Sequence, residues 1–314
     1  MRVLVTGARG KVGRATTTAL VAAGHDVVAT DLQNPEWDMP PPGTPHYVKA
    51  DLTDAGETYA LVGGFSVGEG PRPGPFEAVV HAAAIPAVGR HAPHVIFSNN
   101  LMATFNVVEA CVRSGVRRLV NISSETVPGF IFAERPFFPA YLPVDEEHPV
   151  EPQDPYALAK LFGEQLCDAA VRRSDLRCIS LRPGWVQDAA SYPRNLGPFL
   201  RDRSRPAING WAYIDADDLA DAIRLAVDSD LPGHEVFALA NPETIGDRDL
   251  HKAWREVFPD APTELRPLDR PDASGISSRK AYEVLGWRPS RSWRDHLTDD
   301  GEPRAVWRTS GRLE

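Results

Sequence analysis

Cysteine is scarce in this sequence of 314 residues, which holds only Cys111, Cys167 and Cys178. The three residues form no CxxC pair, and their odd number disfavours a disulfide framework. Unpaired cysteines are typical of a reducing compartment. We therefore expect an intracellular protein and place it in the cytoplasm.

The sequence also offers little to bind a metal ion. His91 and His94 lie three residues apart, but no third ligand accompanies them at a spacing typical of a metal site. We therefore expect solvated histidines and no metal.

Long apolar runs and an excess of positive charge are absent as well. No run approaches the length that we expect of a membrane span, and the opening "MRVLVTGARG" enters a strand-like pattern at once, which leaves no room for a signal peptide. The net charge is −9 and the pI is about 5.5. This balance argues against a nucleic acid or an anionic membrane as the main partner. The expected partner is a small-molecule substrate.

What the sequence does contain is a regular alternation of short β-branched runs with segments of helical spacing. This pattern predicts an α/β fold, a doubly wound parallel sheet of Rossmann type with helices on both faces. The expected strands are residues 2–6, 25–31, 46–52, 76–84, 116–124 and 176–184. The expected helices are residues 10–23, 54–61, 95–114 and 154–173.

The alternation weakens after Gly184. A helix is expected over residues 215–228, with Asp215 as its N-cap, a strand over 235–240, and helices over 247–258 and 277–285. The tail from Ser292 is polar and has no clear pattern. We expect residues 1–184 to form a cofactor-binding domain to which 212–240 return. Residues 185–211 and 241–314 are then expected to form a small substrate-binding lobe.

Three stretches read as loops. Residues 34–45 and 62–75 are rich in proline and glycine, which indicates surface loops. The stretch 125–153 is longer and holds Phe130, Phe132, Phe137, Phe138 and Tyr141. A loop of this length within a compact domain is usually functional, and we expect it to form a wall of a substrate pocket.

A glycine-rich turn follows the first expected strand. The stretch "TGARGKVG" holds Gly7, Gly10 and Gly13, with Arg9, Lys11 and Val12 between them. Glycines let the backbone approach a pyrophosphate, and the N-terminus of the next helix offers free N–H groups. Because a strand precedes the turn and a helix follows it, the pattern predicts a dinucleotide site.

Asp31 ends the second expected strand. A carboxylate there accepts hydrogen bonds from the ribose hydroxyls and repels a 2′-phosphate, so it favours NAD over NADP. Arg9 in the glycine loop favours NADP instead, because a guanidinium can bind a phosphate. We give Asp31 the greater weight and expect NAD.

A tyrosine and a lysine, Tyr156 and Lys160, lie one turn apart on the expected helix 154–173. The spacing alone is common on amphipathic surface helices. A nearby ammonium would nevertheless favour a phenolate and lower the pKa of the tyrosine, which suits an acid/base residue.

The ordered set of motifs resembles the extended short-chain dehydrogenase/reductases, the NAD-dependent epimerase/dehydratase family, over most of the chain. The resemblance depends on "TGARGKVG", Asp31, "ADL" at 50–52, "HAAA" at 81–84, "NNLMATFNVVEAC" at 99–111, "NISSETVPG" at 121–129, "DPYALAK" at 154–160, "LRPGW" at 181–185 and "YIDADDLADAI" at 213–223, with "SRKAYEVLGWRPS" near the end.

The resemblance implies roles for the central residues. Tyr156 would be the catalytic acid/base, and Lys160 would lower its pKa and hold the nicotinamide ribose. Ser124 would orient the substrate oxygen, with Ser123 as its possible substitute. Glu125 and Trp185 are further candidates to contact the substrate.

The resemblance also implies cofactor contacts elsewhere. Asp51 and Leu52 would lie near the adenine, and Ala82, Ala83 and Ala84 would pass under the adenosine and pyrophosphate. Asn100, or Asn99 in its place, would steady the site from behind. Pro183 and Gly184 would approach the nicotinamide. His81 is expected to be a packed residue at a strand end.

Two departures from the family pattern concern the substrate. The chain has "PG" at 128–129 where the family often has "YG", and "RPGWVQDAASYPRNLGPF" carries no clear nucleotide-sugar signature. We expect an NAD-dependent oxidoreductase that acts on a secondary alcohol or carbonyl of a sugar, uronate or related small molecule.

Two other functions stay open. An epimerase or dehydratase would keep its cofactor, and Glu125 next to Ser124 leaves a dehydratase possible. A non-catalytic NAD-sensing regulator would also fit this fold. By analogy with the family we expect a homodimer formed through helices 95–114 and 154–173.

Overall fold

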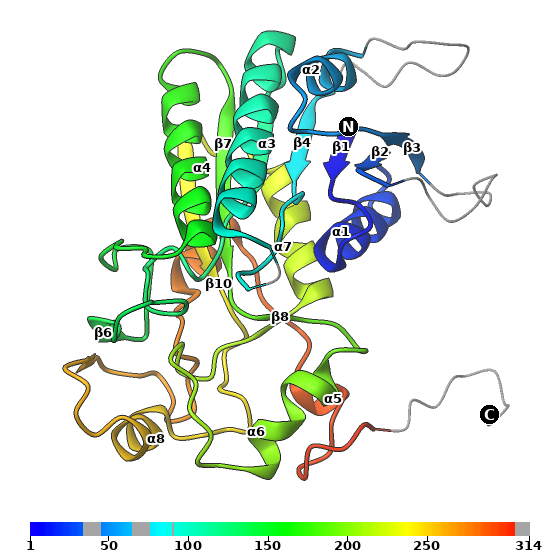
Figure 1. The fold of residues 1–314 in the computed structure, drawn as a ribbon. Coiled ribbons are helices and arrows are strands. Elements are labelled where there is room, and N and C mark those ends of the chain that lie inside the picture. Colours follow the sequence, from blue (N-terminus) through cyan, green and yellow to red (C-terminus); the bar gives the residue numbers. More distant parts are fainter. Residues whose placement is uncertain (34–44, 65–75, 90, 305–314) are drawn as a thin grey trace, which may run out of the picture.

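A parallel sheet organises the upper part of the molecule (Figure 1). The computed structural model describes residues 1–33, 45–64, 76–89 and 91–304. Seven strands pair in the order β10-β7-β5-β4-β1-β2-β3, and every neighbouring pair is parallel. This is the strand order of a doubly wound dinucleotide-binding fold, so the predicted fold class is confirmed. The strands are β1 (Arg2–Thr6), β2 (Asp26–Asp31), β3 (His46–Lys49), β4 (Ala78–His81), β5 (Arg118–Ile122), β7 (Arg177–Pro183) and β10 (His234–Leu239).

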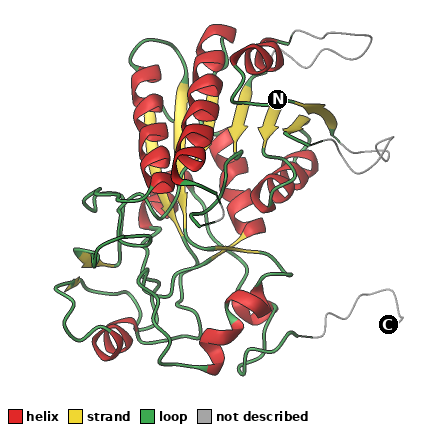
Figure 2. Cartoon of the chain, viewed as in Figure 1, coloured by secondary structure: helices red, strands yellow, loops and turns green. Residues whose placement is uncertain are grey.

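Helices cover both faces of the sheet, as the secondary-structure colouring makes clear (Figure 2). Because side chains alternate along a strand, Val3 and Val5 of β1 join the core of one face and Leu4 joins the core of the other. One face is covered by α1 (Lys11–Ala22), α7 (Ala216–Asp228) and η1 (Ala281–Leu285), and the other by α2 (Ala55–Gly63), α3 (Pro93–Ser114) and α4 (Pro155–Val171).

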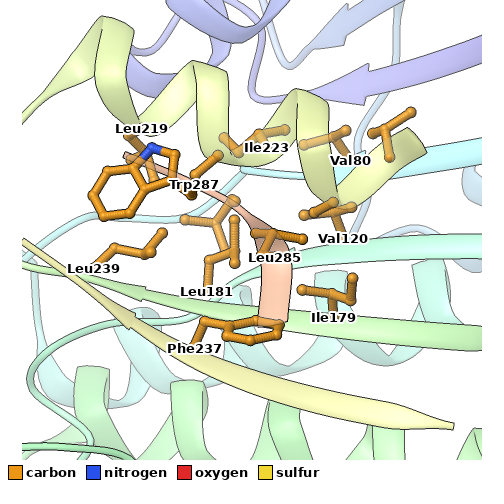
Figure 3. Packing of buried hydrophobic residues seen from close by; sticks show 14 of the residues in the cluster. Val80, Val120, Ile179, Leu181, Leu219, Ile223, Phe237, Leu239, Leu285 and Trp287 are labelled. Atoms are coloured by element: carbon orange, nitrogen blue, oxygen red, sulfur yellow. The ribbon is translucent and has the colours of Figure 1, made fainter. Parts of the chain in front are cut away.

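Large apolar side chains fill the space between α7 and the sheet (Figure 3). Leu219 and Ile223 of α7 point toward the strands, and Trp287 fills the space beside them. The indole of Trp287 donates a hydrogen bond to the Asp218 carbonyl at 2.9 Å, which satisfies the polar atom that its burial would otherwise leave unpaired. Segment 212–240 thus contributes both a strand and a helix to the sheet layers.

The three cysteines all lie in the core of the α3–α4 face. Cys111 is on α3, Cys167 on α4 and Cys178 on β7. All three are free and at most 1% exposed.

A second core lies below the sheet, in the part of Figure 1 that is mostly loops and short helices. Trp211, Trp254, Tyr192 and Tyr213 are its largest fully buried side chains. Its short elements are β6 (Tyr141–Leu142), β8 (Val186–Gln187), α5 (Tyr192–Asn195), α6 (Gly197–Arg201), β9 (Ile214–Asp215), α8 (Leu250–Val257), β11 (Glu264–Leu265) and η2 (Trp293–Asp295).

Several predicted boundaries shift for local reasons. The expected helix 247–258 begins only at Leu250, because Asp247 has a positive φ of 49° and Asp249 accepts a capping bond from the Lys252 amide. The expected helix 277–285 contains a short π-helical turn, which Gly286 ends with a φ of 70°. The two proline- and glycine-rich loops lie mostly outside the described residues.

The tail from Ser292 has more structure than its polar composition indicates. Ser292 caps η2 and accepts a hydrogen bond from the Arg294 amide. Trp293 and Leu297 are buried in the lower core. Two apolar side chains among polar neighbours therefore hold this segment in place.

The expectation that no apolar run approaches the length of a membrane span is wrong for α3. This helix of 22 residues has a mean hydropathy of 1.3 in its most apolar window, enough to cross a membrane by length and composition. Half of that window is buried inside the protein. A core helix of a soluble domain passes the same test, so the finding is weak evidence for a span.

Candidate active site

A cavity of about 670 Å³ lies where the sheet strands end. Ligands of open α/β sheets bind at this edge. Its wall includes most of the residues predicted from the sequence, namely Gly7, Gly10, Lys11, Val12, Gly13, Ala82, Ala84, Ser123, Ser124, Glu125, Tyr156, Lys160, Pro183, Gly184 and Trp185. Six predicted residues are not part of this wall, namely Arg9, Asp31, Asp51, Leu52, Ala83 and Asn100.

The first turn of α4 sets the position of Tyr156. Asp154 caps this helix, and its carboxylate accepts hydrogen bonds from the amides of Tyr156 and Ala157, both at 2.9 Å. Pro155 occupies the first helical position, where a missing N–H costs nothing. Because residues four apart share a helix face, Lys160 lies beside Tyr156, with its ammonium 5.8 Å from the ring centroid.

The ammonium of Lys160 is held from behind. It donates a hydrogen bond of 2.6 Å to the carbonyl of Ile122, the last residue of β5. Both Lys160 and Tyr156 are buried, at 7% and 9% exposure. Helix α4 and strand β5 therefore meet at this pair of side chains.

The two candidate serines face different partners. Ser124 lies close enough to the phenol of Tyr156 to lower its pKa, and its hydroxyl accepts from the Thr126 amide at 3.1 Å and hydroxyl at 3.0 Å. Ser123 donates instead to the Glu164 carboxylate at 2.5 Å. Of the two residues, Ser124 is the one that the fold brings to the tyrosine.

The prediction that Lys160 lowers the pKa of Tyr156 is wrong when only the groups of the protein act on the phenol. Burial raises the pKa of Tyr156 to about 12, the Ser124 hydrogen bond opposes this, and the charges of Glu125 and Asp154 add to it. Burial also lowers the pKa of Lys160 to about 8, against the charge of Glu164. Desolvation of the phenol therefore outweighs any help from the ammonium, which is directed at a carbonyl.

A buried ion pair supports this corner of the site and was not foreseen from the sequence. Arg182 of β7 donates two hydrogen bonds to Glu164, at 2.8 and 2.7 Å. Both side chains are less than a tenth exposed. Glu164 lies one turn beyond Lys160 on α4, so the available signal was the regular spacing of residues 156, 160 and 164.

The glycine loop fits a dinucleotide on its own geometry. Gly7 has a φ of 65°, and a Cβ there would lie 2.7 Å from the backbone of Ala83. A Cβ on Gly13 would lie 2.1 Å from the Gly7 carbonyl oxygen. The next helix, α1, has no side-chain cap and no acidic residue in its first turn, which leaves its N-terminal N–H groups available for an anion such as a pyrophosphate.

Asp31 lies at the end of β2, beside the glycine loop. Its carboxylate accepts hydrogen bonds from the amides of Arg9 at 3.0 Å and Leu32 at 2.8 Å. The Arg9 guanidinium donates to the side chain of Gln33 at 2.8 Å. The acid therefore faces the loop where a ribose is expected, and the arginine bonds a neighbouring glutamine.

Asparagines on α3 hold backbone segments near the cavity. The amide of Asn100 accepts from the Ile85 N–H at 2.8 Å and donates to the Ile85 carbonyl at 3.0 Å, while Asn99 bonds Asn100. Asn106 donates to the carbonyl of Leu52 at 3.0 Å. Asp51 accepts from the amide and the hydroxyl of Thr53.

His81 is a packed residue at a strand end, as expected. Its ring nitrogens bond the hydroxyls of Thr6 at 3.0 Å and Thr104 at 3.1 Å. Burial, with a smaller contribution from the charge of Lys160, lowers the pKa of His81 to about 3. The ring is therefore neutral at physiological pH.

Glu125 and Asn209 form a polar pair in the wall of the cavity. The Asn209 amide donates to the Glu125 carboxyl at 2.9 Å. Burial raises the pKa of Glu125 to about 8, which the Asn209 bond partly offsets. The carboxyl is thus largely protonated at neutral pH. Asn209 was missed in the sequence, because it lies in segment 185–211, which has no regular pattern.

The aromatic loop 125–153 contributes less wall than expected. Phe132 lines the cavity and its ring meets that of Tyr156 edge-on, with 6.5 Å between centroids. Phe130, Phe137 and Phe138 instead pack in the lower core. Trp185 and Phe199 also line the cavity, and their rings meet edge-on.

Lys11 connects the glycine loop to the lower part of the molecule. Its ammonium donates to the carbonyl of Val186 at 2.9 Å and to the hydroxyl of Ser191 at 2.8 Å. Asp188 lies 3.7 Å away. The loop that would hold the pyrophosphate is therefore bonded to the segment that follows β7.

Comparison with known proteins agrees with this geometry. A family model described as the NAD dependent epimerase/dehydratase family matches residues 3–187. The UDP-glucose 4-epimerase of Mycolicibacterium smegmatis is 29% identical over 92% of this chain and 94% of its own length. The UDP-glucose 4-epimerase 1 of Oryza sativa subsp. japonica is 30% identical over 91% of this chain and 89% of its own length.

Solved structures with the same fold are also found. A short-chain dehydrogenase/reductase superfamily protein from Agrobacterium tumefaciens, solved with bound NAD, has a TM-score of 0.67 and 25% identity, and the match covers 94% of each chain. MoeE5, in complex with UDP-glucose and NAD, has a TM-score of 0.66 at 23% identity over 94% of this chain and 95% of its own. At this identity the second match supports the fold alone.

Proposed function

Because the chain belongs to the NAD-dependent epimerase/dehydratase family, we propose that it transfers a hydride between NAD and a secondary alcohol or carbonyl of a sugar or related small molecule. The family is NAD-dependent, so NAD is the cofactor, as expected from Asp31. The observation that supports the proposal most directly is the meeting of Tyr156, Ser124 and Lys160 at a cavity that also contains the glycine loop.

In the proposed reaction Tyr156 moves the proton. Its phenolate accepts the proton of the substrate hydroxyl during oxidation, and the phenol returns that proton during reduction. Ser124, which lies beside the phenol, holds the substrate oxygen in line with it. Lys160, whose ammonium lies 5.8 Å from the centroid of the Tyr156 ring, would hold the nicotinamide ribose. When bound, NAD supplies the hydride acceptor at its nicotinamide ring.

The remaining cofactor contacts follow the predicted residues. The uncapped start of α1 and the close approach at Gly7 and Gly13 suit a pyrophosphate. Asp31 would accept from the ribose hydroxyls, and Pro183 and Gly184 would border the nicotinamide end. Residues 1–184 with 212–240 would hold the cofactor, and the rest of the chain would complete the substrate site.

An epimerase with retained cofactor is the second candidate. The named relatives are UDP-glucose 4-epimerases. The same tyrosine, serine and lysine would serve both reactions, because an epimerase oxidises its substrate transiently.

The test is to incubate the protein with excess NAD and a panel of sugars, uronates and simple secondary alcohols, and to follow NADH by absorbance. Stoichiometric NADH that depends on substrate supports the dehydrogenase. Substrate consumption without net NADH supports the epimerase. No change in any substrate contradicts both.

The choice of cofactor gives a separate prediction. Replacing Asp31 with alanine removes a charged acceptor, whose hydrogen bonds contribute about 1.5–3 kcal/mol. We expect the preference for NAD over NADP, measured as a ratio of kcat/KM, to fall by about tenfold or more. Asp26→Ala, on the same strand at its other end, is the control. An unchanged ratio in the Asp31 variant would contradict this assignment.

A homodimer through α3 and α4 remains part of the proposal. Val95, Met102 and Phe105 of α3 are 37%, 42% and 40% exposed, and their spacing puts them on one helix face. We expect Phe105→Glu to turn a dimer into a monomer in analytical ultracentrifugation, because a charge at a packed interface stays unpaired. Val284→Glu, at another exposed apolar side chain, should leave the mass unchanged. A monomeric unmodified protein would refute the dimer.

A further inference from the structure

The cavity wall is poor in positive charge. Of the described residues that line it, only Lys11 and Lys160 are basic. Lys11 bonds Val186 and Ser191, and Lys160 bonds the Ile122 carbonyl. Both lysines are thus engaged with the protein.

One further cation approaches the cavity without entering its wall. The Arg205 guanidinium lies 5.1 Å from the ring centroid of Phe199, and Arg205 is exposed. Phe199 faces the cavity and Arg205 does not line it. Among the described residues, the part of the wall beyond Tyr156 therefore has no basic side chain that could bind a carboxylate or a diphosphate.

A charged substrate would be costly in this part of the cavity. Moving an anion out of water is unfavourable unless a cation or several donors compensate it. The side chains there include Ile131, Phe132, Trp185, Phe199 and Ile208, which provide no donor to an anion apart from the indole N–H of Trp185. The apolar wall thus disfavours a uronate and a nucleotide sugar alike.

The polar groups that are present suit hydroxyl groups. Ser124 and Tyr156 meet at the reacting end, and Glu125 and Asn209 form a second polar pair next to them. A protonated carboxyl both donates and accepts a hydrogen bond, as does a hydroxyl. The Asn209 amide already donates to Glu125 and to the Ala212 carbonyl, so it offers its oxygen as an acceptor. Two neighbouring hydroxyl groups of one ligand would find partners at these two pairs.

The size of the cavity points the same way. A volume of about 670 Å³ is within the range of about 300–1,000 Å³ for one small-ligand site. Its wall already includes the glycine loop and the nicotinamide end of the proposed cofactor site. The part of this volume that the cofactor leaves free is therefore smaller still, which favours a compact substrate.

We propose that the substrate is an uncharged ring compound with neighbouring hydroxyl groups, such as an unmodified sugar or a cyclitol. This inference rests on the proposed function. Glu125 and Asn209 bind a hydroxyl next to the one that reacts at Tyr156. The faces of the ring pack between Phe132 and Trp185.

Binding to the NAD-loaded Tyr156→Phe protein tests this without turnover. By calorimetry we compare hexoses and inositols with the matching hexuronates and UDP-hexoses. We expect the best neutral compound to bind at least about tenfold more tightly than its charged counterparts. Tighter binding of a uronate or a UDP-hexose, or no binding of any neutral compound, would overturn the inference.

Variants identify the groups responsible. Glu125→Ala should weaken binding of the neutral ring compound by about tenfold, and Glu283→Ala, an exposed glutamate bonded to Arg279, should not. UDP-hexose binding that Arg205→Ala abolishes would show a phosphate site at the rim and contradict the proposal.

NADH formation by the unmodified protein separates the two proposals. Oxidation of uronates alone would leave the dehydrogenase intact and refute the neutral substrate. Binding of neutral compounds without any conversion would support the preference for a neutral ligand and contradict the dehydrogenase.

Discussion

Replacing Tyr156 with phenylalanine should lower kcat by about 10²–10⁴-fold, the range for loss of a positioned acid/base. The substitution removes one hydroxyl from a ring that is 9% exposed and packed edge-on against Phe132. Binding of NAD should remain, because the glycine loop and Asp31 are unchanged. The comparison is made by steady-state kinetics together with titration of NAD.

A second measurement tests the role of the hydroxyl more closely. Burial holds the pKa of Tyr156 at about 12 in the protein alone. Oxidation needs the phenolate, so below that pKa the rate should rise with pH, and this rise should disappear in the phenylalanine variant. Tyr59→Phe on α2, away from the cavity wall, is the control. Turnover that survives Tyr156→Phe would contradict the acid/base role. A non-catalytic sensor would show no turnover in either form and unchanged NAD binding.

The second large effect is expected at the buried pair of Glu164 and Arg182. Glu164→Ala leaves a guanidinium without its carboxylate in a site less than a tenth exposed, and one nitrogen of Arg182 already lacks a partner there. Breaking a buried pair in this way costs about 3–5 kcal/mol. We expect that loss in the free energy of unfolding, measured by urea denaturation.

The double variant Glu164→Leu with Arg182→Leu distinguishes a lost pair from a lost packing contact. Removing both charges is often close to neutral, so the double variant should recover much of the stability. Glu283→Ala, which breaks an exposed pair with Arg279, should cost less than about 1 kcal/mol. A similarly small loss for Glu164→Ala would mean that the buried pair does not stabilise the fold.

The sheet and the close packing of the glycine loop were predictable because their signals are local. Most strands of the sheet are short apolar runs, and β1, β2, β4, β5 and β7 each have residues in both cores, as Val3 and Leu4 of β1 do. Gly7 and Gly13 are required by contacts within the same turn or with the adjacent strand. The pair Tyr156 and Lys160 is fixed by one helix turn.

The substrate end could not be predicted in the same way. Asn209 reaches Glu125 across 84 residues, and the chain around it turns at Gly210 and Trp211, whose φ values of 65° and 56° are positive. Tertiary packing sets these positions, and no periodicity reports it. The pKa of Tyr156 shows the same limit. The direction of its shift depends on how deeply the phenol is buried, which the residue spacing does not indicate.

The free thiols allow local opening of the fold to be measured by chemical labelling. Cys111, Cys167 and Cys178 lie in one layer between α3, α4 and β7. A thiol reagent reaches them only when that layer opens, so the labelling rate measures the population of the open form. A ligand that binds only the closed form should slow labelling by a factor of 1 + [L]/Kd. The affinity for NAD, and then for each candidate substrate, can thus be read from a labelling rate.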